Sequence, residues 1–479
     1  MTALLSLAPG GEPGFVRALD IFHRAARDVP AYRAHLERHG IDPDSIRTPE
    51  DFARVPVVTK EEYLRRNPLG ALVWHGDISE AGTWSSSSGS TGKPTYFPRD
   101  LMSLQESIEF YSRMLTRSFD SIGRSTLLVV GFAMGNWIGG TYTYQAALEL
   151  RRRGHRVSVV APGIDAETIL ANIADLGPSY DQVVLAGYPP FVQDVLDRAD
   201  KHVRAMNLGV LLAGENISEE WRDHILDRIG QPDRPDRTCL IYGTADAGVM
   251  GHETPTTIDI RRLARTDPRL RTELFGDDDP AMPTFVEYDP NLRFTETDEQ
   301  GRFLFTVDSA LPLVRYRIND EGTIRTPWRV AAVLRRCGYR IPVRTSTFGA
   351  GFLALRRRSD VAASFYAVKL YPESVRAALE SAAVRELVTG KFVLATVSDA
   401  AFAQTLDLRV ELRESVEPSG ELAAQLQQLV TAALDRTNSE YRKLRTVPGV
   451  VAEPVITLIP FGGNGFHYTV KHKYLESNR

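Results

Sequence analysis

The sequence predicts an α/β protein with a large N-terminal α/β domain (residues 1–358), including a β-rich subdomain, and a small mobile α+β C-terminal domain (residues 359–479). Three observations predict it. Short apolar runs alternate with amphipathic stretches over residues 101–245, the pattern of a mostly parallel sheet with crossover helices. From residue 284 apolar and polar residues alternate between turns, as in antiparallel strands. The 479 residues are also many for one hydrophobic core.

Composition narrows the class of protein. Its 43% hydrophobic and 25% charged residues are typical of soluble globular proteins, and a net charge of -4 gives no basic footprint for nucleic acid. Two cysteines, Cys239 and Cys337, are too few for a disulfide framework and fit a reducing compartment. The chain starts without a basic, apolar leader, and no later window approaches the roughly 20 apolar residues of a membrane span. We therefore expect a cytoplasmic protein that binds neither nucleic acid nor membrane.

The elements follow in order. A helical lead-in is expected over residues 13–64, then a helix at 101–117, a strand at 125–132 and a helix from 139 to 153. Further short apolar runs predict strands at residues 157–160, 183–185, 209–212 and 238–241. In the C-terminal domain we expect two strands within 391–412, a helix over 421–438 and a strand at 455–459.

The segment with the clearest chemical signature is Ser85–Thr95, SSSSGSTGKPT. Glycines let backbone N–H groups turn toward one oxyanion, hydroxyls add donors and a lysine adds charge. A Walker loop has four residues between its glycines and Ser or Thr after its lysine, whereas here two residues intervene and Pro94 follows. A flexible Ser-rich linker is the alternative. We expect a phosphate loop with the donors Ser87, Ser88, Gly89, Ser90, Thr91, Gly92 and Lys93.

Ligands of parallel sheets bind beyond the carboxyl ends of the strands. Four loops that follow predicted strands should therefore line one cleft, and they contain Trp137, Tyr188, Gly214-Glu215 and Tyr242-Gly243. The candidates for the substrate pocket are Trp137, Gly139 and Tyr188, with ordinary packing as the alternative for the two aromatic rings.

Several segments resemble acyl-adenylate-forming enzymes, and their phenylacetate-CoA ligase branch in particular. SSGSTGKPT is similar to their phosphate loop, and their entry segment is similar to VPAYRAHLERHGIDPDSIRTPEDFARVPVVTKEEYL. YGTAD resembles Tyr-Gly-x-Thr-Glu, and RYRIND resembles Arg-Tyr-Arg-Thr-x-Asp. The resemblance runs from Val29 to Leu475. It implies an ATP-dependent ligase that activates a carboxylic acid, expected to be an aryl acid, as acyl-AMP with release of pyrophosphate, and then transfers the acyl group to CoA or an amine.

The resemblance also implies roles for single residues. It implies ATP and Mg²⁺ as cofactors, and it is compatible with a homodimer. The base of the nucleotide would meet Gly214, Glu215, Asn216, Tyr242, Gly243 and Thr244. Asp320 and Arg358 would meet the ribose, Asp246 would bind Mg²⁺, and Asp360 would be the hinge between the domains. Lys471, chosen over Lys473 by its position after a glycine-rich turn, would be the adenylation lysine. A solvated loop acid is the alternative for Asp246, and a turn residue for Asp320.

Departures from the family pattern keep other functions open. Asp246 stands in place of glutamate, Arg357 in place of glycine, Val361 in place of aspartate, and Ala367 in place of the glycine beside which pantetheine passes. From the last three of these changes we expect an acceptor other than CoA. A second hypothesis is a diazo-forming ligase (diazotase) of natural-product biosynthesis, which adenylates nitrite for reaction with an arylamine. A third is a nucleotide-binding module without catalysis.

Overall fold

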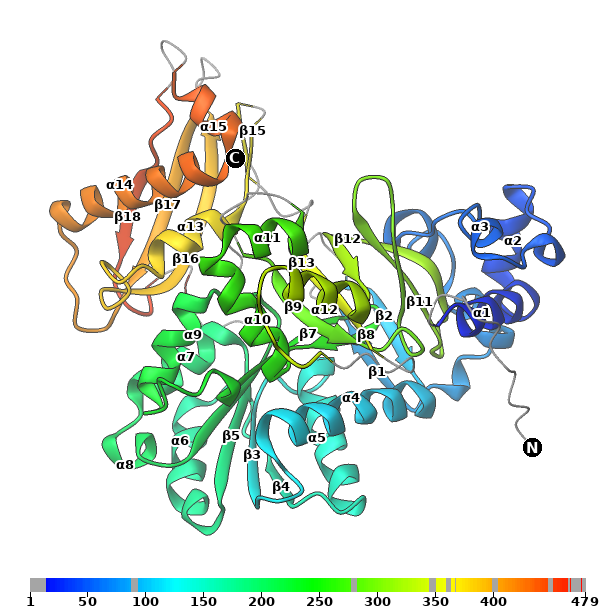
Figure 1. Cartoon of the computed structure of the whole chain (residues 1–479), viewed down its shortest axis with the longest axis horizontal. Helices are drawn as coiled ribbons and strands as arrows, with labels where there is room; N and C mark the ends of the chain where they lie inside the picture. Colours follow the sequence, from blue (N-terminus) through cyan, green and yellow to red (C-terminus); the bar gives the residue numbers. More distant parts are fainter. Residues whose placement is uncertain are drawn as a thin grey trace.

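The computed structural model describes residues 14–87, 94–276, 282–343, 350–358, 363–366, 368–398, 404–446, 451–463, 466 and 475, with only the backbone of residues 357, 358, 364, 369 and 398. A large body carries a smaller C-terminal domain, coloured yellow to red, on one side (Figure 1). This arrangement confirms the predicted fold class.

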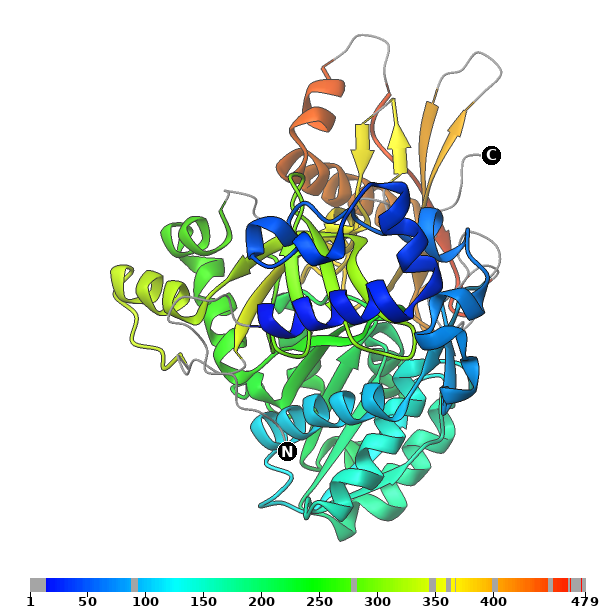
Figure 2. The ribbon, with the colours of Figure 1, turned by 90° about the vertical axis from the view of Figure 1, so that its right-hand side faces the viewer.

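The N-terminal part is helical, as predicted, up to a small hairpin. Its elements are α1 (Phe15–Asp28), α2 (Pro30–Arg38), η1 (Pro43–Ser45), α3 (Pro49–Phe52), the π-helix η2 (Lys60–Leu64), η3 (Leu69–Leu72), η4 (Trp74–Gly76), η5 (Ile78–Glu80), β1 (Thr83–Ser86) and β2 (Tyr96–Arg99). Phe15 and Phe22 of α1 share one hydrophobic core with Phe305 and Tyr316 of the later strands. The N-terminal helices therefore lie across those strands (Figure 2).

The middle of the chain alternates strands and helices. It comprises α4 (Leu101–Phe119), β3 (Thr126–Gly131), α5 (Ile138–Arg152), β4 (Val157–Val160), α6 (Ala166–Leu176), η6 (Gly177–Ser179), β5 (Gln182–Gly187), α7 (Pro189–Arg198), α8 (Lys201–Arg204), β6 (Leu208–Ala213), α9 (Glu219–Arg228), η7 (Pro235–Arg237) and β7 (Thr238–Thr244). Strands β4, β3, β5, β6 and β7 are neighbours in that order and all parallel. Leu127 packs with α6, α7 and α9, and Leu128 with α4 and α5, so helices bury both faces of the sheet.

The antiparallel part continues the same sheet. It comprises β8 (Gly248–His252), α10 (Pro255–Thr266), α11 (Pro268–Phe275), β9 (Thr284–Tyr288), β10 (Phe294–Thr297), β11 (Arg302–Val307), β12 (Leu313–Arg325), α12 (Pro327–Arg336) and β13 (Gly351–Arg358). Among the described residues, eleven strands form one sheet in the order β10-β11-β12-β13-β9-β8-β7-β6-β5-β3-β4. The β-rich subdomain is joined to the parallel half by the pair His252 and Glu287.

The C-terminal domain has its own core. Its elements are β14 (Ala363–Phe365), β15 (Val368–Leu370), α13 (Pro372–Leu379), β16 (Val388–Ser398), β17 (Gln404–Leu412), α14 (Gly420–Thr437), α15 (Ser439–Leu444) and β18 (Val455–Ile459). The apolar cluster of this domain contains only residues from Ala363 onward, and the other described clusters end at or before Leu355. The boundary predicted between residues 358 and 359 borders residues outside the described set and stays a prediction.

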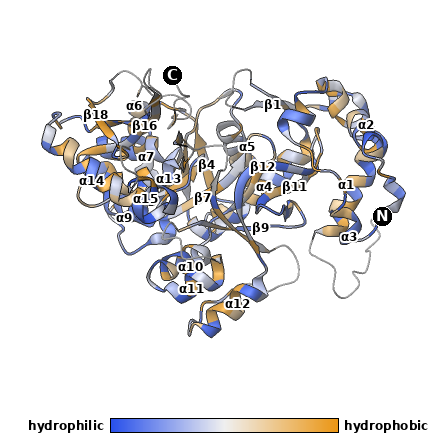
Figure 3. Cartoon of the chain, turned by 90° about the horizontal axis from the view of Figure 1, so that it is seen from above, coloured by the Kyte–Doolittle hydropathy of each residue, from blue (hydrophilic) through white to orange (hydrophobic). Residues whose placement is uncertain are grey.

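Hydropathy follows this layering (Figure 3). Helices such as α10 and α12 carry both hydrophilic and hydrophobic residues, whereas the strands beneath them are mostly hydrophobic. Of the helices that the structure describes, none combines the length and the apolar character needed to cross a bilayer.

A single glycine supports the packing of β12 against its neighbours. A Cβ atom on Gly322 would lie 2.2 Å from the carbonyl oxygen of Ala354 and 2.6 Å from the ring of Phe303. We expect Gly322→Ala to lower the free energy of unfolding by about 1–3 kcal/mol, measured by urea denaturation, because backbone atoms must move. Gly420→Ala, where nothing lies within 4 Å, is the matched control and should not destabilise. Equal stability of the two variants would contradict this packing.

Candidate active site

Four loops leave the sheet at one edge. Gly131 of β3 pairs with Gly187 of β5, Gly187 pairs with Leu212 of β6, and the next residue of β6, Ala213, pairs with Ile241 of β7. Because these strands are parallel and in register, their following loops begin side by side, as the sequence predicted.

The loop after β6 holds the tyrosine that follows β5. Gly214 has a φ of 100°, and a Cβ there would lie 3.2 Å from the ring of Tyr188. The hydroxyl of Tyr188 donates to the carboxylate of Glu215. Tyr188, predicted to line the substrate pocket, therefore supports the predicted base loop of residues 214–216.

The predicted adenine and ribose residues meet across the sheet. The hydroxyl of Tyr242, which is buried, donates to Asp320 Oδ2 at 2.7 Å. Asp320 lies opposite Arg358 in the register of β12 with β13. Asp320 is itself buried, which argues against a solvated turn residue. Three predicted nucleotide residues thus come together from three different strands.

Asp246 is a buried acid with two close partners. Its Oδ1 lies 2.9 Å from the ammonium of Lys60, and its Oδ2 accepts a hydrogen bond of 2.5 Å from the hydroxyl of Tyr316. The Asp246 side chain is 9% exposed. Burial first, and then the charge of Asp246, raise the pKa of Tyr316 well above its usual value. Asp246 is therefore not the solvated loop acid of the alternative hypothesis.

Backbone hydrogen bonds between β12 and Val58 place Lys60 beside Asp246. Val58 N donates to the carbonyl of Arg315 at 3.3 Å, and Arg317 N donates to the carbonyl of Val58 at 2.9 Å. The hydroxyl of Thr59 then caps the helix that begins at Lys60. Arg315 has a φ of 46°, a left-handed conformation that costs energy in a residue other than glycine.

Contacts from Arg315 to the N-terminal part hold this conformation. Its guanidinium donates to the carbonyls of Ala53, at 2.6 Å, and Val55. The left-handed conformation of Arg315 in β12 is therefore held by the same N-terminal segment that places Lys60 beside Asp246.

Both ends of the predicted phosphate loop lie near Asp246. Arg99 donates from Nε to the Ser85 hydroxyl at 3.0 Å and from Nη2 to the carbonyl of Ala245. Burial lowers the pKa of Arg99 from its usual value. Thr95 N donates to Ser87 Oγ at 3.0 Å and closes the base of the loop. The residues between, Ser88, Gly89, Ser90, Thr91, Gly92 and Lys93, lie outside the described residues.

Other predicted site residues have simple local settings. Trp137 is half-buried before α5, and Gly139 lies in the first turn of α5 beside the ring of Phe132. Thr244 Oγ1 accepts a hydrogen bond from Ala247 N, and Gly243 is exposed. Asp360, Lys471, Lys473 and the side chain of Arg358 lie outside the described residues. Their roles stay predictions.

Sequence reasoning missed four residues that contact this site: Lys60, Arg99, Tyr316 and Arg376. Lys60 and Tyr316 lie inside segments that carry the family resemblance, so their positions offered a signal. Arg376 lies in the segment RRRSDVAASFYAVKLYPESVRAAL, which also resembles the family, whereas Arg99 offered no signal, because a single arginine near a turn is usually a solvated residue.

The residues around Asp246 fit a magnesium-bound nucleotide. Within the part of the chain that the structure describes, no group of three or more His, Cys, Asp or Glu residues could hold a metal alone. Mg²⁺, however, commonly takes one or two carboxylates together with phosphate oxygens. Asp246 supplies such a carboxylate near the ends of the phosphate loop, and the Lys60 ammonium already occupies one cation position beside it.

Comparisons with known proteins find relatives among the phenylacetate-coenzyme A ligases. No protein-family model matches the chain. The phenylacetate-coenzyme A ligase of Escherichia coli is 26% identical over 324 residues, which cover 65% of this chain and 68% of that protein. That of Aromatoleum evansii is 25% identical over 313 residues, which cover 63% and 64%. The alignments thus span about two thirds of these relatives.

A solved structure covers the whole chain. 2-Hydroxyisobutyryl-CoA ligase, in its postadenylation state with 2-HIB-AMP, is 18% identical, with a TM-score of 0.64 over 100% of this chain and 95% of that chain. In its thioesterification state, with CoA also bound, it is 19% identical with a TM-score of 0.51 over 97% and 88%. The arrangement of this chain is therefore nearer to the postadenylation arrangement of that protein.

The fold is that of adenylate-forming ligases, and the sequence relatives support an AMP-forming ligase. Among the known proteins the chain is similar to phenylacetate-CoA ligases at about 25% identity, which supports the resemblance predicted from its motifs.

The ion pair between Lys60 and Asp246 is testable without any substrate. We expect Lys60→Met to lower the free energy of unfolding by about 1–3 kcal/mol, less than for a fully buried pair because Lys60 is 24% exposed. Asp246→Asn should recover part of that loss in the double variant, because no unpaired charge is then buried. Lys443→Met on α15, at an exposed position, is the control. Strictly additive losses in urea denaturation would contradict the pairing.

Proposed function

We propose that the chain uses ATP to convert an acid to its adenylate and then transfers the activated group to a nucleophile. The observation that carries the proposal is the convergence of Asp246, Tyr242 and Asp320 beside the ends of the phosphate loop. Homology to the phenylacetate-CoA ligases supports the same reaction class and favours an aryl or arylacetic acid as substrate.

Groups on three strands bind the nucleotide. The carboxylate of Asp320, oriented by the Tyr242 hydroxyl, accepts hydrogen bonds from the ribose hydroxyls. The ring of Tyr242 and the loop of residues 214–216 face the base. The hydroxyls and backbone N–H groups of residues 87–93 bind the phosphates, and Arg358 adds a donor near the ribose.

The chemical step requires positioning and charge neutralisation. One oxygen of the acid attacks the α-phosphorus of ATP, and pyrophosphate leaves from the opposite side. Mg²⁺ bound through Asp246 would neutralise phosphate charge. Lys60 can then release Asp246 and remain near the phosphates, and Lys471, from the C-terminal domain, donates to the acid and the α-phosphate as charge moves between them.

Two observations bear on the acceptor, and they favour different molecules. The relatives are CoA ligases, and the structural neighbour binds CoA in its thioesterification state, which favours CoA. Arg357, Val361 and Ala367 depart from the CoA-ligase pattern and favour a small amine. We propose CoA as the first acceptor to test and an amine as the second.

The test is ATP–pyrophosphate exchange with the purified full chain, Mg²⁺ and a panel of acids, including phenylacetate, benzoates, short hydroxy acids and nitrite. Exchange that depends on a carbon acid is the expected result. Exchange driven by nitrite alone would replace the proposal with the diazo-forming reaction. Binding of ATP without exchange for any acid would make the chain a nucleotide-binding module.

The adenylation lysine has a specific prediction. Lys471→Ala should reduce exchange by roughly 10²-fold or more while leaving ATP affinity intact, because the lysine acts mainly as charge develops. Lys473→Ala is the neighbouring control and should remain close to wild type. The reverse outcome, with Lys473→Ala inactive and Lys471→Ala normal, would move the role to Lys473.

The ribose site predicts graded effects on nucleotide binding. Asp320→Ala should raise the KM for ATP by roughly 10- to 100-fold, and Tyr242→Phe by about fivefold, because the proposed ribose hydrogen bonds go to the carboxylate itself, whereas the Tyr242 hydroxyl only orients it. Glu299→Ala, in an exposed turn, is the control. An unchanged KM in Asp320→Ala would remove this residue from the ribose site.

A further inference from the structure

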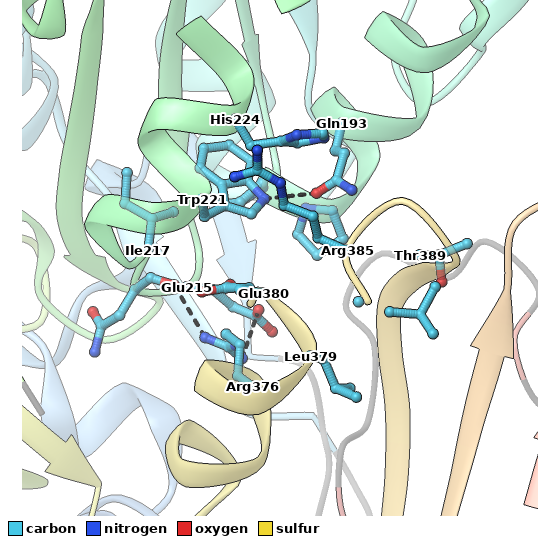
Figure 4. Close-up of a pocket in the computed structure, with 15 residues that line it drawn as sticks. Gln193, Glu215, Ile217, Trp221, His224, Arg376, Leu379, Glu380, Arg385 and Thr389 are labelled. Atoms are coloured by element: carbon cyan, nitrogen blue, oxygen red, sulfur yellow. Dashed lines mark hydrogen bonds and ion pairs between the residues drawn. The ribbon is translucent and has the colours of Figure 1, made fainter. Parts of the chain in front are cut away.

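One face of α13 contacts the loop that joins β6 to α9. Arg376 Nη2 lies 2.9 Å from Glu215 Oε2, and Arg376 Nη1 donates to the carbonyl of Asn216 at 3.0 Å. One turn later, Glu380 accepts a hydrogen bond from the Ser218 hydroxyl. Residues four apart share a helix face, so one surface of the C-terminal domain meets this loop twice. Figure 4 shows Arg376 and Glu380 of this surface beside Glu215.

The contacts made by Arg376 fix both the side chain and the backbone of the predicted base loop. The side chains of Arg376 and Glu215 are 14% and 7% exposed, so the pair is largely shielded from water. Glu215 also accepts from Tyr188, and Ser218 caps α9 by accepting from Trp221 N at 3.0 Å. A guanidinium that bridges a carboxylate and a neighbouring carbonyl restricts a loop more than a single ammonium would.

Ion pairs link the two domains at other points of the boundary. Lys391 Nζ lies 2.9 Å from Asp194 Oδ2, Arg228 Nη2 lies 2.7 Å from Glu386 Oε2, and Arg413 pairs with Asp197. Among the described residues, no hydrophobic cluster contains members of both domains. Polar interfaces of this kind are typical of domains that separate, because water can solvate the charges again.

We propose that Arg376 is a positioning residue that orders the nucleotide-base loop only while the C-terminal domain is docked in this orientation. The role toward nucleotide rests on the proposed function, whereas the docking contact does not. When the domain rotates away, Glu215 and Asn216 lose their contacts with Arg376 on α13, while the Tyr188 hydroxyl still donates to Glu215. Arg376 thus couples the arrangement of the domains to the affinity for nucleotide.

The carboxyl of Glu380 makes docking of the C-terminal domain depend on pH. Burial first raises the pKa of this carboxyl to about 7, Arg376 and the Ser218 hydroxyl oppose that shift, and Glu220 and Glu215 add to it. A carboxyl whose pKa is raised on docking favours the docked state when protonated. Its contribution is complete at low pH and is lost as the pH rises through about 7.

The experiment measures domain docking directly. Spin labels are attached to Asp175→Cys on α6 and Gln428→Cys on α14, both exposed positions, in a Cys337→Ser background. Double electron–electron resonance without nucleotide then reports the docked and displaced populations. Arg376→Ala should shift their ratio by about tenfold toward the displaced state. Arg376→Lys should fall between, because one ammonium cannot bridge both acceptors as the guanidinium does.

Controls separate this role from general destabilisation. Arg436→Ala, at an exposed position on α14, should leave the populations unchanged. Glu215→Gln should shift them in the same direction, and the double variant with Arg376→Ala should shift them no further. Relative to Glu380→Gln, wild type should lose docked population as the pH rises from about 4.5 to 7. Identical distance distributions for wild type and Arg376→Ala would overturn the proposal.

Nucleotide binding completes the test. By isothermal titration, Arg376→Ala should weaken ATP by about the factor by which docking is lost, whereas Arg436→Ala should bind normally. A shift in docking without any change in ATP affinity would overturn the coupling. Failure of pyrophosphate exchange in wild type would instead reject the proposed function, and the spin-label result would still decide whether Arg376 docks the domain.

Discussion

The buried carboxylate of Asp246 is the interaction on which the site depends. A charge with so little exposure is costly unless a cation and donors surround it, and Lys60 and Tyr316 meet that need. These two partners come from the N-terminal part and from β12, while Arg99 binds the carbonyl next to Asp246 and anchors the phosphate loop. One acid therefore brings together segments that have no local reason to meet.

The sheet determines which groups can join that arrangement. Four loops leave its parallel half at one edge. Strand β12 of its antiparallel half reaches the same place, where Asp320 accepts a hydrogen bond from the hydroxyl of Tyr242. The C-terminal domain stands apart, with a core of its own and a boundary made of ion pairs. A body that carries the proposed nucleotide site and a separately packed domain suit the proposed two-step reaction, because the second step can use a different domain arrangement.

Local patterns predicted the fold well, because each buried parallel strand is a short apolar run. The strands Val157–Val160 and Val455–Ile459 occur at the predicted bounds. Loops after strands were also predictable, since a parallel sheet sends them to one edge. Contacts between distant residues were not: Lys60 and Asp246 are 186 positions apart, and their meeting depends on the register of Val58 with Tyr316. Arg376 was missed because its partner lies in another domain.

The most direct test of adenylation follows an oxygen atom. The acid that best supports exchange is labelled with ¹⁸O in its carboxylate and incubated with ATP, Mg²⁺, the acceptor and the purified chain. Attack of the acid on the α-phosphorus leaves one labelled oxygen in the bridge, and it departs with AMP when the acceptor takes the acyl group. Mass spectrometry should therefore find AMP with one ¹⁸O atom. Formation of ADP with the label in inorganic phosphate would contradict adenylation.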